Sequence, residues 1–268
     1  MAEELIYFHG IPGGSGELSL FGDDLADGRS AIHVVDRSNV KDWAEPDEYF
    51  RNVAGAIRMR FPYQPLRLIG FSLGASVALR TAPYLDAQIS GIDLISVAAP
   101  LGLGDYLGAM AGAPVFKLAK SNPTFFAGLV RLQSFAARLF PGRLHDALFA
   151  SAQGADLVLS KDATFKAAML PILQQSLGAQ RATYISEIAL YVQDWEAELD
   201  QVTQPVTIYH GIADTWSPVA MAQDLARRLP RVDAVHLLDD LSHYSTLCEY
   251  GQRYCTQPDH RDDWTAGV

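Results

Sequence analysis

The residues Gly70 to Gly74 read GFSLG and place a serine, Ser72, between two glycines. An apolar run over 66–69 precedes them, and a helix-like segment over 73–85 follows. On a tight strand-to-helix turn, a serine hydroxyl stands above the sheet edge near the helix N-terminus, where it can act as a nucleophile. The glycines keep such a turn free of Cβ clashes. The alternative interpretation is a serine that only caps the helix.

A serine hydroxyl is a poor nucleophile without a base, and the base needs an acid to orient it. The loop HGIADTWSP contains Asp214, and the loop LSHYS contains His243. We expect Ser72, Asp214 and His243 to form a catalytic triad in which His243 is the base and Asp214 orients it. Two alternatives stay open: His243 is an ordinary loop histidine, or the acid comes from the end of another strand. His9 and His210 each end a strand and precede glycine, which suits residues that orient loops through hydrogen bonds.

A glycine-rich loop, YFHGIPGGSG, follows the first strand-like run. It has no Gly-Lys-Ser/Thr ending and does not read G-x-G-x-x-G, so a nucleotide-binding loop is disfavoured. A doubly wound sheet in the order 2-1-3-4-5-6 places this loop and GFSLG beside the same crevice. The loop can then aim a backbone N–H at the oxyanion that forms when Ser72 attacks a carbonyl. Pro12 has no N–H, so Ile11 is the expected donor, with Gly13 second, and Leu73 is the other donor.

Short apolar runs alternate with helix-like segments along most of the chain. We expect six strands, over 5–8, 31–35, 66–69, 92–97, 206–209 and 234–238. Helices are expected over 47–61 and 73–85, from Pro218 with Ser217 as N-cap, and after His243. Buried-looking strands that alternate with helices indicate an α/β fold, with a parallel sheet of about six strands and helices on both faces.

About a hundred residues between Pro100 and Pro205 contain no clear strand, which is far too long for a simple connection. Apolar residues recur there at helical spacing, at Phe125, Leu129, Leu132, Ala136 and Leu139. We therefore expect 101–200 to form an inserted helical cap, and 1–100 together with 201–268 to form the core.

The composition of the 268-residue chain, 49% hydrophobic and 19% charged, is that of a globular protein. Its formal net charge of −10 argues against nucleic acid or an anionic membrane as the main partner, because phosphate binding needs a basic field. No stretch approaches the roughly 18–20 apolar residues of a membrane span. No secretory signal is visible, and we expect a cytoplasmic protein. The two cysteines, Cys248 and Cys255, are expected to be free thiols.

Together, the three motifs HGIPGG, GFSLG and the loops of Asp214 and His243 resemble the α/β-hydrolase superfamily of serine hydrolases, over essentially the whole chain outside 101–200. The resemblance implies Ser72 as nucleophile, His243 as base, Asp214 as orienting acid, a cap over the site, and no cofactor or metal. Epoxide hydrolases and haloalkane dehalogenases place aspartate at the elbow, so Ser72 speaks against both.

The expected function is hydrolysis of a small, apolar carboxylic ester or related acyl compound through an acyl-enzyme. Two alternatives are carbon–carbon bond hydrolysis of a ring-cleavage product and a non-catalytic ligand receptor. The expected partner is a small-molecule substrate, and the protein is expected to be a monomer or a homodimer. Aromatic and aliphatic residues of the insertion are expected to line the pocket or to form the insertion's own core: Phe116, Phe125, Phe126, Leu129 and Phe135.

Overall fold

A computed structural model describes residues 3–21, 32–40 and 43–256, except for the side chains of residue 39 and residues 254–256. All six expected strands form one parallel sheet in the order β2-β1-β3-β4-β5-β6, as predicted. Their bounds are β1 Glu4–Phe8, β2 Ile32–Val34, β3 Leu66–Phe71, β4 Ile89–Ile95, β5 Val206–Gly211 and β6 Val232–Leu238. Residue 31, predicted to begin the second strand, lies outside the described residues.

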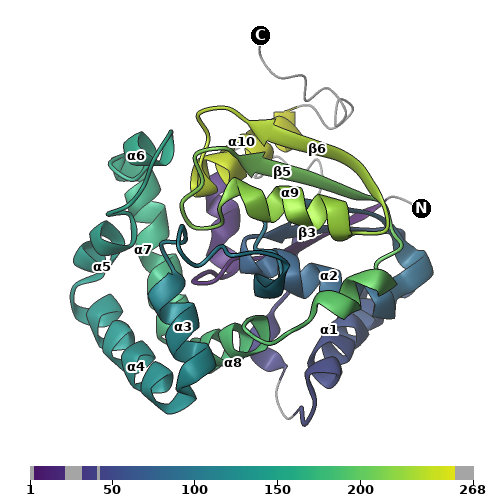
Figure 1. Cartoon of the computed structure of the whole chain (residues 1–268), viewed down its shortest axis with the longest axis horizontal. Coiled ribbons are helices and arrows are strands. Elements are labelled where there is room, and N and C mark those ends of the chain that lie inside the picture. Colours follow the sequence, from purple (N-terminus) through teal and green to yellow (C-terminus); the bar gives the residue numbers. More distant parts are fainter. Residues whose placement is uncertain (1–2, 22–31, 41–42, 257–268) are drawn as a thin grey trace.

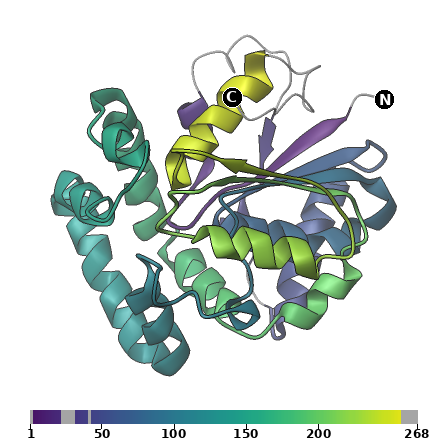
Figure 2. The same ribbon diagram turned by 45° about the horizontal axis from the view of Figure 1, so that its top comes forward.

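Helices cover both faces of the sheet (Figures 1 and 2). Along β1, Ile6 and Phe8 pack in one core cluster and Leu5 and Tyr7 in another, as the two-residue period of a strand requires. The first cluster contains the helices α1 (Pro46–Arg60), α2 (Leu73–Leu85) and α9 (Val219–Arg228). The second contains the 3₁₀ helix η1 (Ser15–Phe21) and α10 (His243–Thr256). The sheet is therefore buried on both sides, which agrees with its apolar strands.

Residues 96–205 contain helices and no strand. These helices are α3 (Ala113–Ser121), α4 (Pro123–Leu139), α5 (Pro141–Leu148), α6 (Asp156–Leu159), α7 (Ala163–Leu177) and α8 (Arg181–Tyr191). In both ribbon views α3 to α7 stand to the left of the sheet.

One capping prediction was wrong. Ser217 was expected to cap the helix α9, but the helix begins one residue later, and Pro218 holds the N-cap position. The backbone of Pro218 is extended, with a ψ of 144°, so the first helical residue is Val219. The N–H of Ser217 donates to Asp214 Oδ1 at 2.9 Å.

Two smaller expectations concern the cysteines and the membrane. Cys248 is a free thiol, and burial raises its pKa to about 12, so it stays protonated at neutral pH. The side chain of Cys255 lies outside the described residues. Among the described helices, none combines the length and the apolar character needed to cross a bilayer.

Candidate active site

Ser72 occupies the sharp turn between β3 and α2, as predicted. Its φ of 56° and ψ of −126° lie outside the regions that L-residues ordinarily adopt. The flanking glycines are needed for close approach. A Cβ on Gly74 would lie 2.2 Å from the carbonyl oxygen of Phe8, and one on Gly70 would lie 2.6 Å from Cα of Ala75. The turn therefore needs Gly-x-Ser-x-Gly for steric reasons.

The structure brings Ser72, His243 and Asp214 into one hydrogen-bonded chain. Nε2 of His243 lies 2.9 Å from Oγ of Ser72, and its Nδ1 lies 2.8 Å from Oδ2 of Asp214. All three residues are buried. They come from three different loops at one edge of the sheet, after β3, β5 and β6.

The carboxylate of Asp214 is held on both oxygens. Its Oδ1 accepts the backbone N–H groups of Trp216 at 2.8 Å and Ser217 at 2.9 Å, while Oδ2 faces His243. His210 donates from Nε2 to the carbonyl oxygen of Ser217 at 2.8 Å, and burial lowers the pKa of His210. The expectation that His210 orients a loop is thus confirmed, and the loop that it orients carries Asp214.

The imidazole of His243 has a second set of supports that the sequence did not reveal. The indole of Trp216 stacks on it, with ring centroids 5.7 Å apart. Asp156, from α6, accepts the N–H groups of Tyr244 and Ser245 at 3.0 and 2.7 Å. Because these N–H groups belong to the first turn of α10, a buried carboxylate holds the end of the helix that begins at His243.

A buried glutamate, Glu17, holds the loop after β1. Its Oε2 accepts the backbone N–H of Gly10 at 2.9 Å and the phenol O–H of Tyr7 at 2.8 Å. Burial raises the pKa of Glu17 to about 7, against the lowering effect of those hydrogen bonds and of Arg37. Glu17 follows the glycine-rich loop by one residue, and sequence reasoning passed over it. The backbone N–H of Gly13, the second oxyanion donor considered, instead donates to Oγ of Ser176 at 3.2 Å.

A buried ion pair braces the other side of this loop. Arg37 donates from Nε and Nη2 to the two carboxylate oxygens of Glu187, at 2.6 and 2.9 Å. Its Nη2 also donates to the carbonyl oxygen of His9 at 3.0 Å, and Tyr49 donates to Glu187. Glu187 lies on α8, so the pair ties a helix between β4 and β5 to the start of the glycine-rich loop. Burial and Arg37 lower the pKa of His9.

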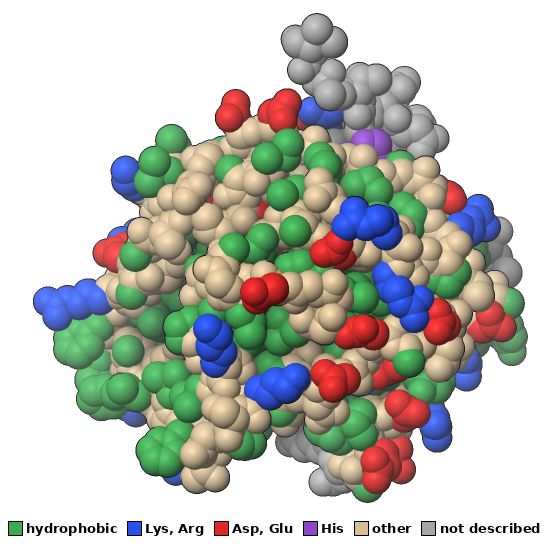
Figure 3. Space-filling view, viewed as in Figure 1, with side chains coloured by type: hydrophobic (Ala, Val, Ile, Leu, Met, Phe, Trp, Pro, Cys, Tyr) green, Lys and Arg blue, Asp and Glu red, His purple; other side chains and the backbone are tan. Residues whose placement is uncertain are grey.

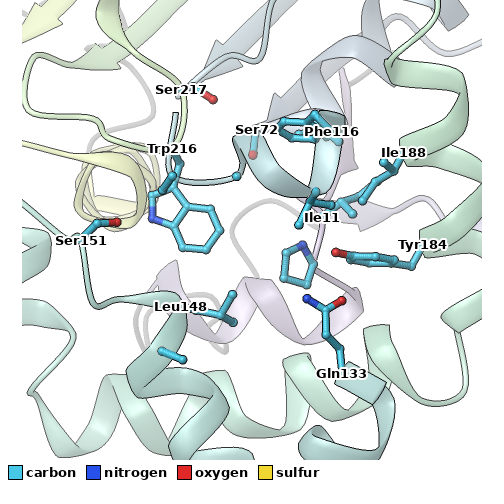
Figure 4. Close-up of a pocket in the computed structure, with 16 residues that line it drawn as sticks. Ile11, Ser72, Phe116, Gln133, Leu148, Ser151, Tyr184, Ile188, Trp216 and Ser217 are labelled. Carbon is cyan, nitrogen blue, oxygen red and sulfur yellow. The ribbon is translucent and has the colours of Figure 1, made fainter. Parts of the chain in front are cut away.

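A cavity of about 160 Å³ opens beside Ser72 (Figure 4). In that view, the indole of Trp216 stands opposite Tyr184 and Ile188, with Gln133 and Leu148 at the far end from Ser72. The lining residues the structure describes include no Asp, Glu, Lys or Arg. They are Ile11, Pro12, Ser72, Leu73, Ala111, Gly112, Val115, Phe116, Gln133, Ala147, Leu148, Ser151, Tyr184, Ile188, Trp216 and Ser217.

Only one of the five aromatic and aliphatic side chains considered for the pocket lines this cavity, namely Phe116. Phe126 is buried in the core cluster. Phe125 and Phe135 are exposed on the outer face of α4, and Leu129 is half-buried outside the lining. The helical spacing located the helix correctly, but it did not say which apolar face turns inward.

A six-stranded parallel sheet with a serine elbow after β3, followed by acid and histidine loops after β5 and β6, has the architecture of the α/β-hydrolases. Comparison with known families agrees. Residues 4–247 match the family Hydrolase_4, described as serine aminopeptidase, S33, and the chain belongs to this family.

Solved structures share the fold at low sequence identity. A bromoperoxidase from Bacillus anthracis superposes with a TM-score of 0.68 and 17% identity, covering 94% of this chain and 90% of that one. A putative lipase from Acinetobacter baumannii AYE gives 0.65 and 17%, covering 96% and 82%. An esterase from Exiguobacterium antarcticum gives 0.60 and 15%, covering 94% and 92%.

A curated relative matches a short part of the chain. The pimeloyl-[acyl-carrier protein] methyl ester esterase of Aromatoleum aromaticum (strain DSM 19018 / LMG 30748 / EbN1) is 46% identical over 50 residues. The match spans 19% of this chain and 20% of the relative.

Proposed function

We propose that this α/β-hydrolase cleaves a small, uncharged carboxylic ester or related acyl compound through a Ser72–His243–Asp214 triad. The observation that carries the proposal is the continuous hydrogen-bonded chain from Asp214 through His243 to the Ser72 hydroxyl, which ends in the wall of a cavity. The strained backbone of Ser72 costs free energy, and such strain is found mainly at functional sites. With His243 and Asp214 buried beside it, the strain favours a catalytic role for the hydroxyl.

The hydrogen bonds give the direction of proton flow. The carboxylate of Asp214 only accepts, so it holds the proton of His243 on Nδ1. Nε2 then carries a lone pair and accepts the Ser72 O–H proton as Oγ attacks the carbonyl carbon. The imidazolium returns that proton to the leaving alkoxide. Water, deprotonated by the same Nε2, then attacks the acyl carbon. The bond from that carbon to Oγ of Ser72 breaks, the imidazolium returns the proton to Oγ, and the acid is released.

The developing oxyanion needs two donors, and we propose the backbone N–H groups of Leu73 and Ile11. Leu73 is the first residue of α2, where a backbone N–H has no partner within the helix and the helix dipole favours negative charge. Both residues line the cavity next to Ser72. The N–H of Gly13 is engaged by Ser176, which leaves Ile11 as the better candidate on that loop.

The cavity supports a small and neutral substrate. A protein cavity of about 150 Å³ holds one benzene molecule, so about 160 Å³ fits an acyl group of roughly six heavy atoms. An aminopeptidase must bind the ammonium group of its substrate, and the described lining offers no carboxylate for that purpose. The ester named for the curated relative suits this lining better than a peptide N-terminus does.

We also propose that 101–200 act as the cap. Lining residues come from α3, α4, α5 and α8, or from the segments next to them, and these elements face the elbow across the cavity. Such a cover excludes water while the acyl-enzyme forms, and it sets the length of acyl chain that fits.

Labelling with a fluorophosphonate tests the proposal, since the probe reacts only with an activated serine. We expect a peptide map to place the label on Ser72, and Ser72→Ala to remove both the label and about 10⁴–10⁶-fold of kcat. A series of p-nitrophenyl esters should peak in kcat/KM at short chains, from acetate to hexanoate. Well-folded protein that takes no label and cleaves no ester would refute the triad.

A further inference from the structure

A row of large apolar side chains stands on the outside of α4. Between 49% and 70% of each side chain is exposed in a set that we call the apolar ridge, made of Phe125, Leu132, Phe135, Leu139 and Phe140. The first four lie at i, i+7, i+10 and i+14, so they share one helix face. Single exposed apolar residues need no explanation, but a continuous row usually marks a binding surface.

The surroundings of the ridge are basic. From residue 106 to residue 145 the sequence contains no Asp or Glu, although the whole chain has a net charge of −10. The same segment carries exposed cations at Lys117, Lys120, Arg131, Arg138 and Arg143. Figure 3 shows hydrophobic and basic side chains gathered at the lower left, where α3 and α4 lie in Figure 1.

Acidic groups from neighbouring elements approach the edges of this surface. Lys120 pairs with the exposed Asp194 at 3.5 Å, and Asp146 on α5 lies 2.5 Å from Lys166. Arg131 and Arg138 lie on the ridge helix itself, next in sequence to Leu132 and Leu139. The ridge therefore combines apolar side chains with cations on the same helix.

We propose that the apolar ridge docks the protein on an anionic lipid surface. A surface helix that presents Phe and Leu on one face, flanked by Lys and Arg, lies in a bilayer interface with its apolar side chains among the acyl chains. Anionic headgroups attract the flanking cations. Charge complementarity favours a lipid surface as the partner. The apolar ridge matches the acyl chains of the bilayer, and the basic segment around it matches the anionic headgroups.

A second copy of the chain fits the ridge less well than a lipid surface does. A two-fold symmetric contact through the ridge would bring the same cations of both copies, Arg131 and Arg138 among them, to one interface. Like charges brought together at close range oppose association.

The net charge of −10 opposes docking less than its size suggests. Charges on the far side of the molecule lie beyond a Debye length, about 8 Å at physiological ionic strength, and are largely screened at contact. The charge of the docking face itself, which is positive around the ridge, then decides whether anionic lipid attracts the protein.

Docking here would bring the proposed active site close to the lipid. Phe116 on α3, Gln133 on α4 and Leu148 on α5 line the cavity, while the ridge stands on the outer face of α4. An apolar substrate dissolved in lipid would thus meet the helices that border the pocket. The docking itself does not depend on the proposed hydrolysis, because lipid binding can be measured in the Ser72→Ala variant.

Flotation with lipid vesicles tests the proposal. The full chain is mixed with vesicles of phosphatidylcholine alone or with phosphatidylglycerol, at low and at high salt. We expect binding only to the anionic vesicles and weaker binding in salt. Two double variants should each weaken binding on the order of tenfold or more: Phe135→Ser/Leu139→Ser and Arg131→Gln/Arg138→Gln. The first removes apolar side chains that enter the acyl region. The second removes two cations, each of which contributes about fivefold near such a surface.

Matched controls use residues near the ends of α1 and α9, outside the ridge and its helix. Met59 and Tyr63 are 83% and 79% exposed near the end of α1, so Met59→Ser/Tyr63→Ser removes a similar amount of exposed apolar surface. Arg227→Gln/Arg231→Gln removes two exposed cations elsewhere. Both controls should bind vesicles like the parent.

Four results would overturn the proposal. The first is no vesicle binding by folded parent protein, and the second is equal losses in the ridge variants and the controls. The third is a dimer in sedimentation that Phe135→Ser/Leu139→Ser dissociates, which would assign the ridge to a second copy. Binding of an acidic carrier protein by the ridge, without vesicle binding, would likewise replace the lipid with a protein partner.

Discussion

Glu17 offers a quantitative test of how the loop after β1 is held. Its carboxyl is fully buried, and burial raises its pKa from 4.5 to about 7. Glu17→Gln puts a neutral amide of the same shape in its place. The amide oxygen can accept the same hydrogen bonds from Gly10 and Tyr7. The substitution therefore mimics the protonated form of Glu17 and removes its titration.

The sign of the effect follows from proton linkage. Because the pKa is higher in the folded state, the folded protein binds more protons than the unfolded chain between pH 4.5 and about 7. Stability of the parent therefore falls as pH rises through this window, relative to a variant that does not titrate there. At about 1.36 kcal/mol per pH unit, the total is about 3 kcal/mol, of which about 2.5 falls between pH 5 and pH 8.5.

Thermal unfolding of parent and Glu17→Gln across that pH range measures the difference. We expect the Tm of the variant to gain about 5 °C on the parent between pH 5 and pH 8.5, at about 2 °C per kcal/mol for a chain of this size. Glu45→Gln, at an exposed carboxyl just before α1, is the control and should follow the parent at every pH. Parallel pH profiles for Glu17→Gln and the parent would refute the buried, raised carboxyl.

Three further predictions concern the site and its support. Asp214→Asn should lower kcat about 10⁴-fold at unchanged Tm, since the amide cannot hold His243 in the working tautomer; a loss below tenfold would point to another acid. Leu148→Trp should fill the cavity and lower kcat/KM for hexanoate esters at least tenfold more than for acetate, and equal losses would contradict the assigned pocket. Glu187→Gln should cost about 3–5 kcal/mol in urea unfolding by leaving Arg37 without its anion, and Arg37→Met/Glu187→Met should recover most of that loss.

The strands and the chain order of the site were predictable because both depend on local pattern. A short apolar run bounded by turn residues suffices to place a buried strand, and the strand order follows from right-handed crossovers. The elbow at Ser72 was predictable for a related reason, since few residue combinations fit so tight a turn. Such constraints act within a few residues and can be seen in the sequence alone.

The orientation of α4 was not predictable in this way. The helix is apolar on more than one face, with Phe126, Val130 and Ala137 buried and Phe125 and Leu132 exposed. A period of 3.6 residues locates such a helix but does not choose its inner face. That choice is made by packing against α3 and α5, which adjoin α4 in the chain, and against α7 and α8, which lie farther along it.

The residues that hold the glycine-rich loop could not be predicted either, because they are far apart in sequence. Arg37 and Glu187 are separated by 150 positions, and neither lies in a motif. Yet Arg37 holds the carbonyl of His9 while Glu17 holds the N–H of Gly10, so the peptides just before Ile11 are held from two sides. Since Glu187 belongs to α8, a movement of the proposed cap would shift Arg37 and, through it, the carbonyl of His9 at the start of this loop. The position of the proposed oxyanion donor thus depends on the same helices that border the pocket.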